Sequence, residues 1–275
     1  MYNPSVFRFA TLLILILTVG KAISQSMTFQ EKSATPDFSL YQKALYISSG
    51  DTLPYRILFP ENYDPKKKYP LVLFLHGAGE RGNDNEKQLV HGASLFLKAE
   101  NRKNFPCIVI VPQCPADDFW ASTKIDRTKS PHEIAFLYEN KPNTGLALAI
   151  KLTRQIIKSE SVDKKRVYIT GLSMGGMGTY EAVYRFPKLF AAAAPICGGA
   201  NALAYTKKTA KTPFWIFHGA IDAIVPVQLS RDMYARLQAL KGKVKYTEYP
   251  TVNHNSWDNA FAEPDFLTWL FSNKR

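Results

Sequence analysis

Cysteine is scarce in this sequence, whose 275 residues include only Cys107, Cys114 and Cys197. So few cysteines exclude a fold built on disulfide bridges, and an odd number leaves at least one thiol unpaired. The segment between Cys107 and Cys114 is mostly apolar and typical of a strand. An extended strand would hold these two residues too far apart to bond. We therefore expect all three to be buried apolar side chains, with a structural disulfide as the alternative.

The apolar run near the start, residues 9–19, is too short to cross a bilayer, which needs about 20 residues. Arg8 precedes this run and small residues follow it, an arrangement typical of a secretory signal peptide. We predict that residues 1–24 are a signal peptide cleaved after Ser24. Residues 25–275 are then a periplasmic or secreted domain without stable membrane insertion. An uncleaved membrane anchor is the alternative, and a lipid anchor is disfavoured because no cysteine lies near the cleavage site.

Acidic residues are outnumbered, with 23 Asp and Glu against 35 Lys and Arg and a net charge of +12. Such an excess can indicate a nucleic-acid or membrane-surface partner. The basic residues are scattered over predicted loops and element ends without interleaved exposed aromatics, at residues 66–68, 164–166, 207–211 and 241–245. We therefore expect a solvated basic surface and no nucleic-acid partner, although anionic polymers would not be repelled.

Internal repeats with a period of about 20–50 residues are absent from the sequence, which excludes solenoids and propellers. The composition, 46% hydrophobic and 13% aromatic, excludes a disordered chain. No linker-like shift in composition divides the sequence after the signal peptide. We expect one catalytic domain with a sizeable core.

Short apolar runs alternate with longer amphipathic stretches from about residue 40 onward. The runs predict strands at residues 53–59, 71–75, 108–111, 167–170, 191–196 and 214–217. The amphipathic stretches predict helices at residues 86–97, 144–159, 176–185 and 228–240, and a last one over 257–270 that is interrupted near Pro264. This alternation predicts an α/β fold with a doubly wound, mostly parallel sheet. Residues 115–143 lack clear periodicity and are expected to form a functional or mobile insertion at the ligand-binding edge.

A nucleophile motif, Gly-Leu-Ser-Met-Gly at residues 171–175, follows a predicted strand and opens a predicted helix. Serine on such a sharp turn adopts a strained backbone conformation, and the flanking glycines remove side chains that would clash there. The turn exposes the hydroxyl at the sheet edge, above a helix N-terminus that favours developing negative charge. Ser173 is therefore the predicted nucleophile.

Five histidines are candidates for the base that a serine nucleophile requires. His254 lies in the loop before the last predicted helix and is the predicted general base. The others suit structural or surface roles. His76 and His218 end predicted strands, His91 lies in a helical stretch, and His132 lies in the insertion.

An acid must orient the imidazole and stabilise its protonated form. Asp222 lies just past the predicted strand 214–217, and the chain order serine, aspartate, histidine suits such a triad. Asp258 and Glu248 lie nearer to His254 in the sequence. We expect them on the last helix and in a strand respectively, as surface charges, so Asp222 is the predicted third member.

A glycine-rich turn, HGAGERG at residues 76–82, follows the predicted strand 71–75. A turn at this place supplies one backbone N–H to an oxyanion hole, and the residue after the nucleophile supplies the other. We assign these donors to Ala78 and Met174. Each donor of this kind stabilises a transition state by about 3 kcal/mol.

The segments HGAGERG, GLSMGGMGTY, FHGAIDAIVP and NHNSW together resemble the α/β-hydrolase superfamily. More narrowly, the chain is similar to secreted esterases and "predicted peptidases" near the phospholipase/carboxylesterase, dienelactone hydrolase and feruloyl esterase families, over most of residues 45–272. The resemblance implies the α/β-hydrolase fold and hydrolysis of carboxylic esters by serine, without a cofactor or a metal. These families commonly have glycine before the histidine. This chain has Asn253, a residue type that tolerates left-handed backbone.

Three aromatic residues near the predicted site, Phe119, Trp120 and Trp257, are candidates to wall a substrate pocket, with core packing as the alternative. Exposed aromatic faces suit a sugar ring or a phenolic acyl group. We therefore expect acetyl or feruloyl esters on polysaccharide as substrates. A serine peptidase acting on small peptides is one alternative. A non-catalytic binding protein is the other, and the intact triad disfavours it.

Overall fold

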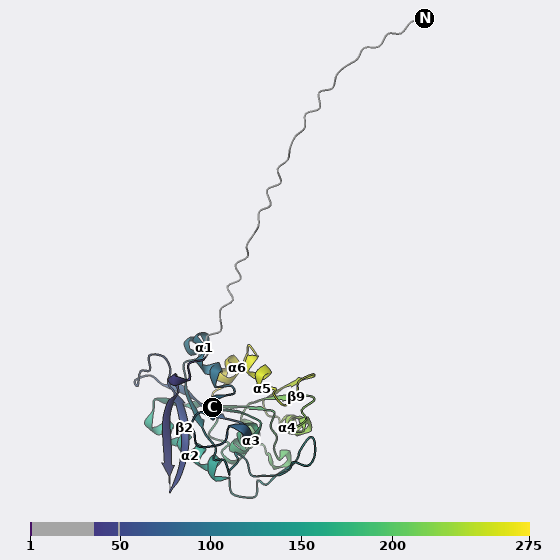
Figure 1. Cartoon of the computed structure of the whole chain (residues 1–275), viewed down its shortest axis with the longest axis horizontal. Coiled ribbons are helices and arrows are strands. Elements are labelled where there is room, and N and C mark those ends of the chain that lie inside the picture. Colours follow the sequence, from purple (N-terminus) through teal and green to yellow (C-terminus); the bar gives the residue numbers. More distant parts are fainter. Residues whose placement is uncertain (2–35, 49) are drawn as a thin grey trace. The chain divides into compact units, whose positions relative to one another are not determined.

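The structure, a computed structural model, describes residues 1, 36–48 and 50–275, and eight strands within these residues form the central sheet (Figure 1). Apart from residue 1, the predicted signal peptide lies outside the described residues. The strand order is β1-β2-β4-β3-β7-β8-β9-β10. The strands are β1 (Gln42–Ser48), β2 (Asp51–Leu58), β3 (Tyr69–Leu75), β4 (Ile108–Pro112), β7 (Val162–Leu172), β8 (Ala192–Ile196), β9 (Phe214–Gly219) and β10 (Val244–Tyr249). β2 pairs antiparallel with β1 and β4, and the other pairs are parallel.

Two apolar cores lie on opposite faces of this sheet, as the side-chain alternation of a strand requires. In β3, Leu71, Leu73 and Leu75 belong to one core, whereas Val72 and Phe74 belong to the other. All seven residues of β3 are buried. This explains why the central strands are continuously apolar in the sequence.

Helices cover both faces of the sheet (Figure 1). The first core contains residues of α2 (Thr144–Ser159), α3 (Met174–Arg185) and α4 (Val227–Ala239). The second contains residues of α5 (Trp257–Ala262), α6 (Phe266–Ser272) and the 3-10 helix η4 (Ala93–Leu97). The remaining helices are α1 (Ala99–Asn104), η1 (Phe38–Leu40), η2 (Ala78–Glu80), η3 (Lys87–Leu89), η5 (Ala202–Ala204) and η6 (Thr209–Lys211). The architecture is the predicted one, the α/β-hydrolase fold.

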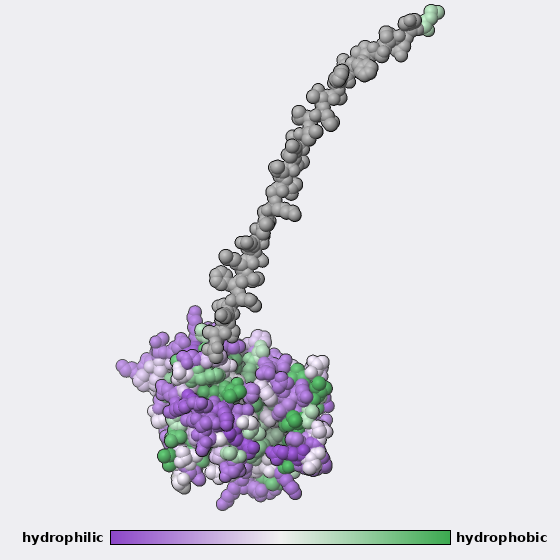
Figure 2. Space-filling view, viewed as in Figure 1, coloured by the Kyte–Doolittle hydropathy of each residue, from purple (hydrophilic) through white to green (hydrophobic). Residues whose placement is uncertain are grey.

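None of the helices within the described residues has both the length and the apolarity needed to span a bilayer. Figure 2 shows one face of the molecule, on which hydrophilic side chains predominate and hydrophobic ones are scattered between them.

The predicted helix over residues 86–97 is wrong. The segment forms the short 3-10 helices η3 and η4, separated at Gly92, whose φ is +79°. A Cβ at this position would lie only 2.3 Å from the ring of Phe261. The close approach of α5 therefore requires a glycine in a left-handed conformation, which ends any helix there.

The insertion at residues 115–143 is more regular than its sequence indicated, because it contains a hairpin. One end is fixed to α3, where the Ser122 amide donates to the buried Glu181 carboxylate at 2.7 Å. The hairpin end is fixed to the loop after β9, where the His132 amide donates to the Ile224 carbonyl at 3.0 Å. The hairpin strands are β5 (Thr123–Asp126) and β6 (Glu133–Phe136).

All three cysteines are buried and unpaired, which confirms that prediction. Burial raises the pKa of each thiol, that of Cys107 to about 12. The thiols are therefore neutral packing groups and not nucleophiles.

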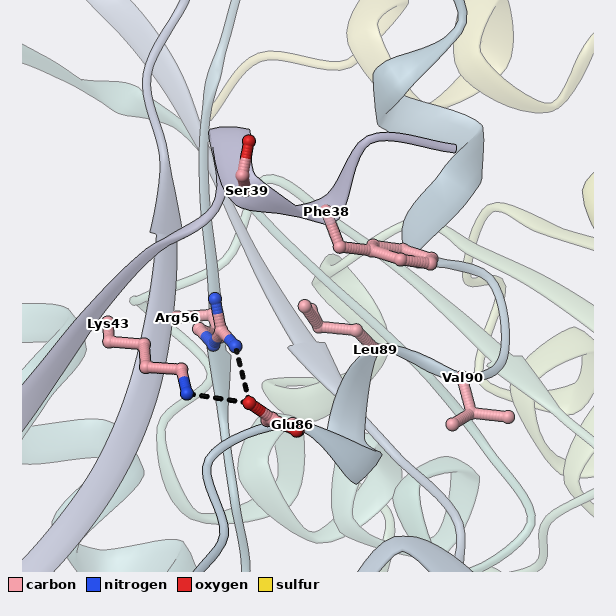
Figure 3. Close-up of a pocket in the computed structure, with 7 residues that line it drawn as sticks. All are labelled: Phe38, Ser39, Lys43, Arg56, Glu86, Leu89 and Val90. Carbon is pink, nitrogen blue, oxygen red and sulfur yellow. Dashed lines mark hydrogen bonds and ion pairs between the residues drawn. The ribbon is translucent and has the colours of Figure 1, made fainter. Parts of the chain in front are cut away.

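A buried guanidinium ties the antiparallel end of the sheet to the segment that carries η3. Arg56 on β2 donates to the Tyr41 carbonyl at 2.7 Å and to the Asn85 carbonyl at 2.6 Å. It also lies 3.9 Å from Glu86, which accepts from Lys43 at 2.6 Å (Figure 3). These contacts form one wall of a cavity of about 470 Å³. None of the predicted catalytic residues lines this cavity.

Candidate active site

Ser173 occupies the sharp turn between β7 and α3, with φ 54° and ψ −115°. The flanking glycines are required, because a Cβ at Gly175 would lie 1.9 Å from the Leu75 carbonyl oxygen. A Cβ at Gly171 would lie 2.5 Å from the Gly175 oxygen. The strained conformation expected from the motif is present, and Ser173 is partly exposed at the sheet edge.

The three residues predicted as a triad lie in one hydrogen-bonded chain. Ser173 Oγ is 2.8 Å from His254 Nε2, and His254 Nδ1 is 2.8 Å from Asp222 Oδ2. An ionised carboxylate only accepts hydrogen bonds, so Nδ1 must be the donor to Asp222. Nε2 of the neutral ring is then the acceptor for the Ser173 hydroxyl. This is the tautomer that a general base requires.

The parallel sheet explains how residues so distant in sequence meet. Ser173 follows β7, Asp222 follows β9 and His254 follows β10, so all three lie at the carboxyl ends of parallel strands. Ligands bind at this edge in α/β sheets. The two other acids considered for the triad do not contact His254. Glu248 lies on β10 and accepts hydrogen bonds from Arg231, and Asp258 lies on α5.

His218, for which the sequence predicts a structural role at a strand end, contacts Asp222, and this contact was not predicted. Its side chain is fully buried, and its Nε2 lies 3.2 Å from Asp222 Oδ2 and 3.1 Å from the Val225 carbonyl. Two acceptors therefore face Nε2, which must carry the proton. Nδ1 then accepts from the Ser230 hydroxyl at 2.7 Å. The available signal was spacing, since His218 precedes Asp222 by four residues across one turn.

The Asp222 carboxylate is buried yet ionised. Burial alone would raise its pKa, but hydrogen bonds from the imidazoles of His218 and His254 outweigh burial and lower the pKa below its usual range. The amides of Ile224 and Val225 also donate to Oδ1, at 2.8 and 2.9 Å. The site therefore presents a fixed negative charge to His254.

Asn253, which stands where similar families have glycine, has a different role from the expected one. It is not among the residues with positive φ. Its Oδ1 accepts from the Ala223 amide at 2.9 Å and from the His254 amide at 2.8 Å. The side chain thereby joins the loop that carries Asp222 to the loop that carries His254.

The glycine-rich turn lies beside the nucleophile. A Cβ at Gly77 would be 3.7 Å from the Ser173 Cβ. The N–H groups of Ala78 and Met174, the predicted oxyanion donors, have no backbone or side-chain acceptor among the described residues. Arg81 shapes the turn by donating to the Ala78 carbonyl at 3.0 Å. Both N–H groups are therefore unused within the described residues, which is the condition that the predicted oxyanion hole requires.

His76 links this turn to the insertion. Its Nε2 accepts from the Cys114 amide at 2.9 Å, so Nδ1 carries the proton and donates to the Gly77 carbonyl. Burial lowers the pKa of His76 to about 4, which keeps the ring neutral. This geometry gives His76 the structural role expected for it.

The candidate pocket aromatics differ in their exposure. Trp120 is fully buried and donates from Nε1 to the His76 carbonyl at 3.1 Å, so it is a core residue and cannot wall a substrate pocket. Phe119 is half-buried beside Arg81. Trp257 is also half-buried, and its ring packs edge-on against His254 at 5.5 Å.

One further side chain near the base was not identified from the sequence. His91, between η3 and η4, packs 5.2 Å from the Trp257 ring. His91, Trp257 and His254 thus form a continuous row of rings at the site.

Comparisons with known proteins agree on the kind of hydrolase this chain resembles. The model of the phospholipase/carboxylesterase family matches residues 62–265, a range that includes the three hydrogen-bonded residues. A solved thermostable esterase is 35% identical with a TM-score of 0.77, covering 86% of this chain and 64% of that one.

Two curated proteins are also similar. A bifunctional acetylxylan esterase/xylanase of Neocallimastix patriciarum is 39% identical over 74 residues, which are 27% of this chain and 11% of that protein. A poly(3-hydroxyoctanoate) depolymerase of Pseudomonas fluorescens is 26% identical in an alignment 276 positions long, gaps included, and the alignment covers 94% of this chain and 95% of that protein. The chain therefore spans less than two thirds of the thermostable esterase and only a small part of the bifunctional enzyme.

Proposed function

Because the chain belongs to the phospholipase/carboxylesterase family, we propose that it is a secreted serine esterase that works through an acyl-enzyme. One observation carries this proposal. An unbroken chain of hydrogen bonds, each 2.8 Å long, runs from Ser173 Oγ through His254 to Asp222.

In the first half of the reaction, Ser173 Oγ attacks the acyl carbonyl carbon while His254 Nε2 takes its proton. The N–H groups of Ala78 and Met174 hold the resulting oxyanion. The bond to the alcohol oxygen then breaks, and the protonated His254 gives its proton to the leaving alkoxide. Asp222 stabilises the imidazolium throughout and stays ionised.

In the second half, water replaces the alcohol. His254 removes a proton from water as the oxygen attacks the acyl-enzyme, and returns it to Ser173 Oγ when the acid leaves. The enzyme is regenerated without a redox step, and the ester and water are the only reactants.

Labelling with a fluorophosphonate tests the nucleophile. We expect the wild-type chain to be labelled at Ser173, and Ser173→Ala to lose both labelling and about 10⁴-fold or more of the turnover of a small ester. Ser39→Ala, which changes an exposed serine, is the matched control and should behave as wild type. Labelling that persists in Ser173→Ala would refute the assignment.

For the substrate, we propose acetyl or feruloyl esters on polysaccharide. The similarity to the acetylxylan esterase/xylanase and the half-buried Trp257, whose ring packs against His254, support this class. Acetylated xylan, methyl ferulate, a 3-hydroxyoctanoate oligomer and a peptide anilide should be compared as substrates, each against Ser173→Ala. Fastest turnover of the anilide or the oligomer would exclude the proposed class.

We also propose that residues 1–24 direct export. The apolar run at residues 9–19 and the small residues after it support this. N-terminal sequencing of the exported protein should then begin at Gln25.

A further inference from the structure

A groove of about 620 Å³ lies at the amino ends of β8, β9 and β10. Its lining comes from the residues just before each of these strands and from residues 272–275, at and after the end of α6. The active site lies at the carboxyl ends of the same strands. The groove and the active site are therefore at opposite ends of the sheet.

Seven exposed cationic side chains line this groove, and no acidic residue is among the described residues that line it. The cations are Lys188, Lys207, Lys211, Lys241, Lys243, Lys274 and Arg275. None of them forms an ion pair with a described residue. The charge of Lys274 helps to lower the pKa of Asp163, but the ion-pair partner of Asp163 is Arg166, at 2.9 Å.

The basic residues that are scattered in the sequence are thus gathered in space. The parallel topology brings the starts of neighbouring strands to one edge, so lysines near residues 188, 207–211 and 241–243 become neighbours. A second depression of about 450 Å³ shares Pro187 and Lys188 with the groove and adds Arg154 and Lys208. The positive surface therefore extends beyond the groove itself.

Several like charges held at one concave surface repel one another, and an anionic ligand relieves that repulsion. Lysine ammonium groups are compact point charges suited to single carboxylates, whereas arginine forks suit bidentate recognition. Six of the seven cations are lysines. The groove therefore suits a polymer that carries single negative charges at intervals along its length.

Two other classes of anionic partner fit the surface less well. Bases of a single-stranded nucleic acid need exposed aromatic rings to stack on, but Phe190, the aromatic side chain in the described lining, is buried. Partial insertion into a lipid surface uses exposed apolar side chains, and the large apolar side chains exposed in the described chain, such as Leu203 and Ile221, do not line the groove.

We propose that this groove is a binding site for an acidic polysaccharide, separate from the ester-cleaving site. The charge of the groove, its concave form and its position away from Ser173 carry the proposal. It does not depend on the proposed reaction, because a polysaccharide without esters can occupy the groove.

The test measures binding of polygalacturonate to the full chain by calorimetry. The groove variant combines Lys211→Gln, Lys241→Gln and Lys243→Gln. The control variant combines Lys98→Gln, Lys103→Gln and Lys151→Gln, three exposed lysines outside the groove, and so carries the same net charge. We expect saturable binding that weakens with salt, about tenfold or more weaker in the groove variant and nearly unchanged in the control.

Turnover of a small soluble ester should be unchanged in both variants, which verifies that they fold. A second variant, Lys207→Gln with Lys274→Gln, removes charges contributed by two other segments and must also weaken binding. Equal losses in the groove and control variants, or no saturable binding, would overturn the proposal. So would equally tight binding of duplex DNA or of phosphatidylglycerol vesicles that depends on the same lysines.

Discussion

Two imidazoles meet at the Asp222 carboxylate, His254 on the side of the nucleophile and His218 from the end of β9. In the proposed reaction His254 exchanges a proton. His218 is buried, and its contact with the Ser230 hydroxyl leaves the proton of the ring on Nε2. His218 can therefore act only through Asp222. We infer that His218 is a positioning residue, which holds the carboxylate in place while His254 accepts and returns the proton in the proposed reaction.

Removing the Nε2–H group with which His218 donates to Asp222 should lower turnover without changing substrate binding. A hydrogen bond to a charged group contributes about 1.5–3 kcal/mol, so we expect His218→Leu to reduce kcat by roughly 10- to 100-fold with KM unchanged. His218→Gln, which can still donate to Asp222, should recover much of the loss. Steady-state kinetics on a small ester provides the measurement. Equal losses in both variants, or a loss confined to KM, would contradict this role.

The role of a single residue can be predicted from the sequence where the residue belongs to a motif, but not where the role depends on contacts between distant segments. Ser173, Asp222 and His254 follow from a turn motif and from chain order, and the structure brings them together. For Trp120 the core-packing alternative is right and the pocket interpretation wrong, and the sequence could not decide between them because burial depends on the packing of the whole insertion. The bridge made by Asn253 depends on how two loops meet, which no local pattern records.

Among the elements, the antiparallel strands depend on one buried side chain. Arg56 supplies two hydrogen bonds to carbonyl groups outside β2, and these acceptors would be left without a partner if it were replaced. We expect Arg56→Met to lower the free energy of unfolding by about 3 kcal/mol. Urea denaturation measures the change.

Lys43→Met is the matched control, because Lys43 also contacts Glu86 but is half-exposed. A surface ion pair contributes about 0–1 kcal/mol, so the control should differ little from wild type. A comparable destabilisation by both variants would show that the Glu86 pairing, and not the buried carbonyl contacts, stabilises this end of the sheet.

A strand could be predicted from the sequence where burial on both faces makes its run of apolar residues continuous. The central strands are apolar on both faces and were found, whereas β1 was missed because Leu45 and Ile47 are exposed at the sheet edge. The hairpin in the insertion is only partly buried, so its alternation is weak. Helix periodicity over residues 86–97 was overridden by the contact at Gly92, a tertiary constraint.

For the whole molecule, the excess of positive charge makes the few stabilised carboxylates important at low pH. Hydrogen bonds from Arg231 and Tyr246 hold the pKa of Glu248 at about 2, although partial burial opposes them. Amide and side-chain hydrogen bonds likewise lower the pKa of Asp84. The pKa of Asp222 is lowered as well. At low pH the folded chain therefore binds fewer protons than the unfolded chain.

Stability should consequently fall in acid. The contribution of Glu248 is complete above the unfolded value of about 4.3 and is lost as the pH falls toward about 2. We expect Glu248→Gln to lose about 1 kcal/mol at neutral pH, since the pair is partly exposed, and to show a shallower decline in acid. Urea midpoints between roughly pH 2 and 6 measure both. Parallel curves for the variant and wild type would contradict the role of this carboxylate.

The unpaired, buried thiols have a practical consequence for a chain proposed to be exported. No disulfide bond stabilises the native state, so folding requires neither a thiol oxidase nor a disulfide isomerase. A reducing agent should leave activity intact. Protein purified from a reducing cytoplasm should have the same specific activity as protein that has been exported.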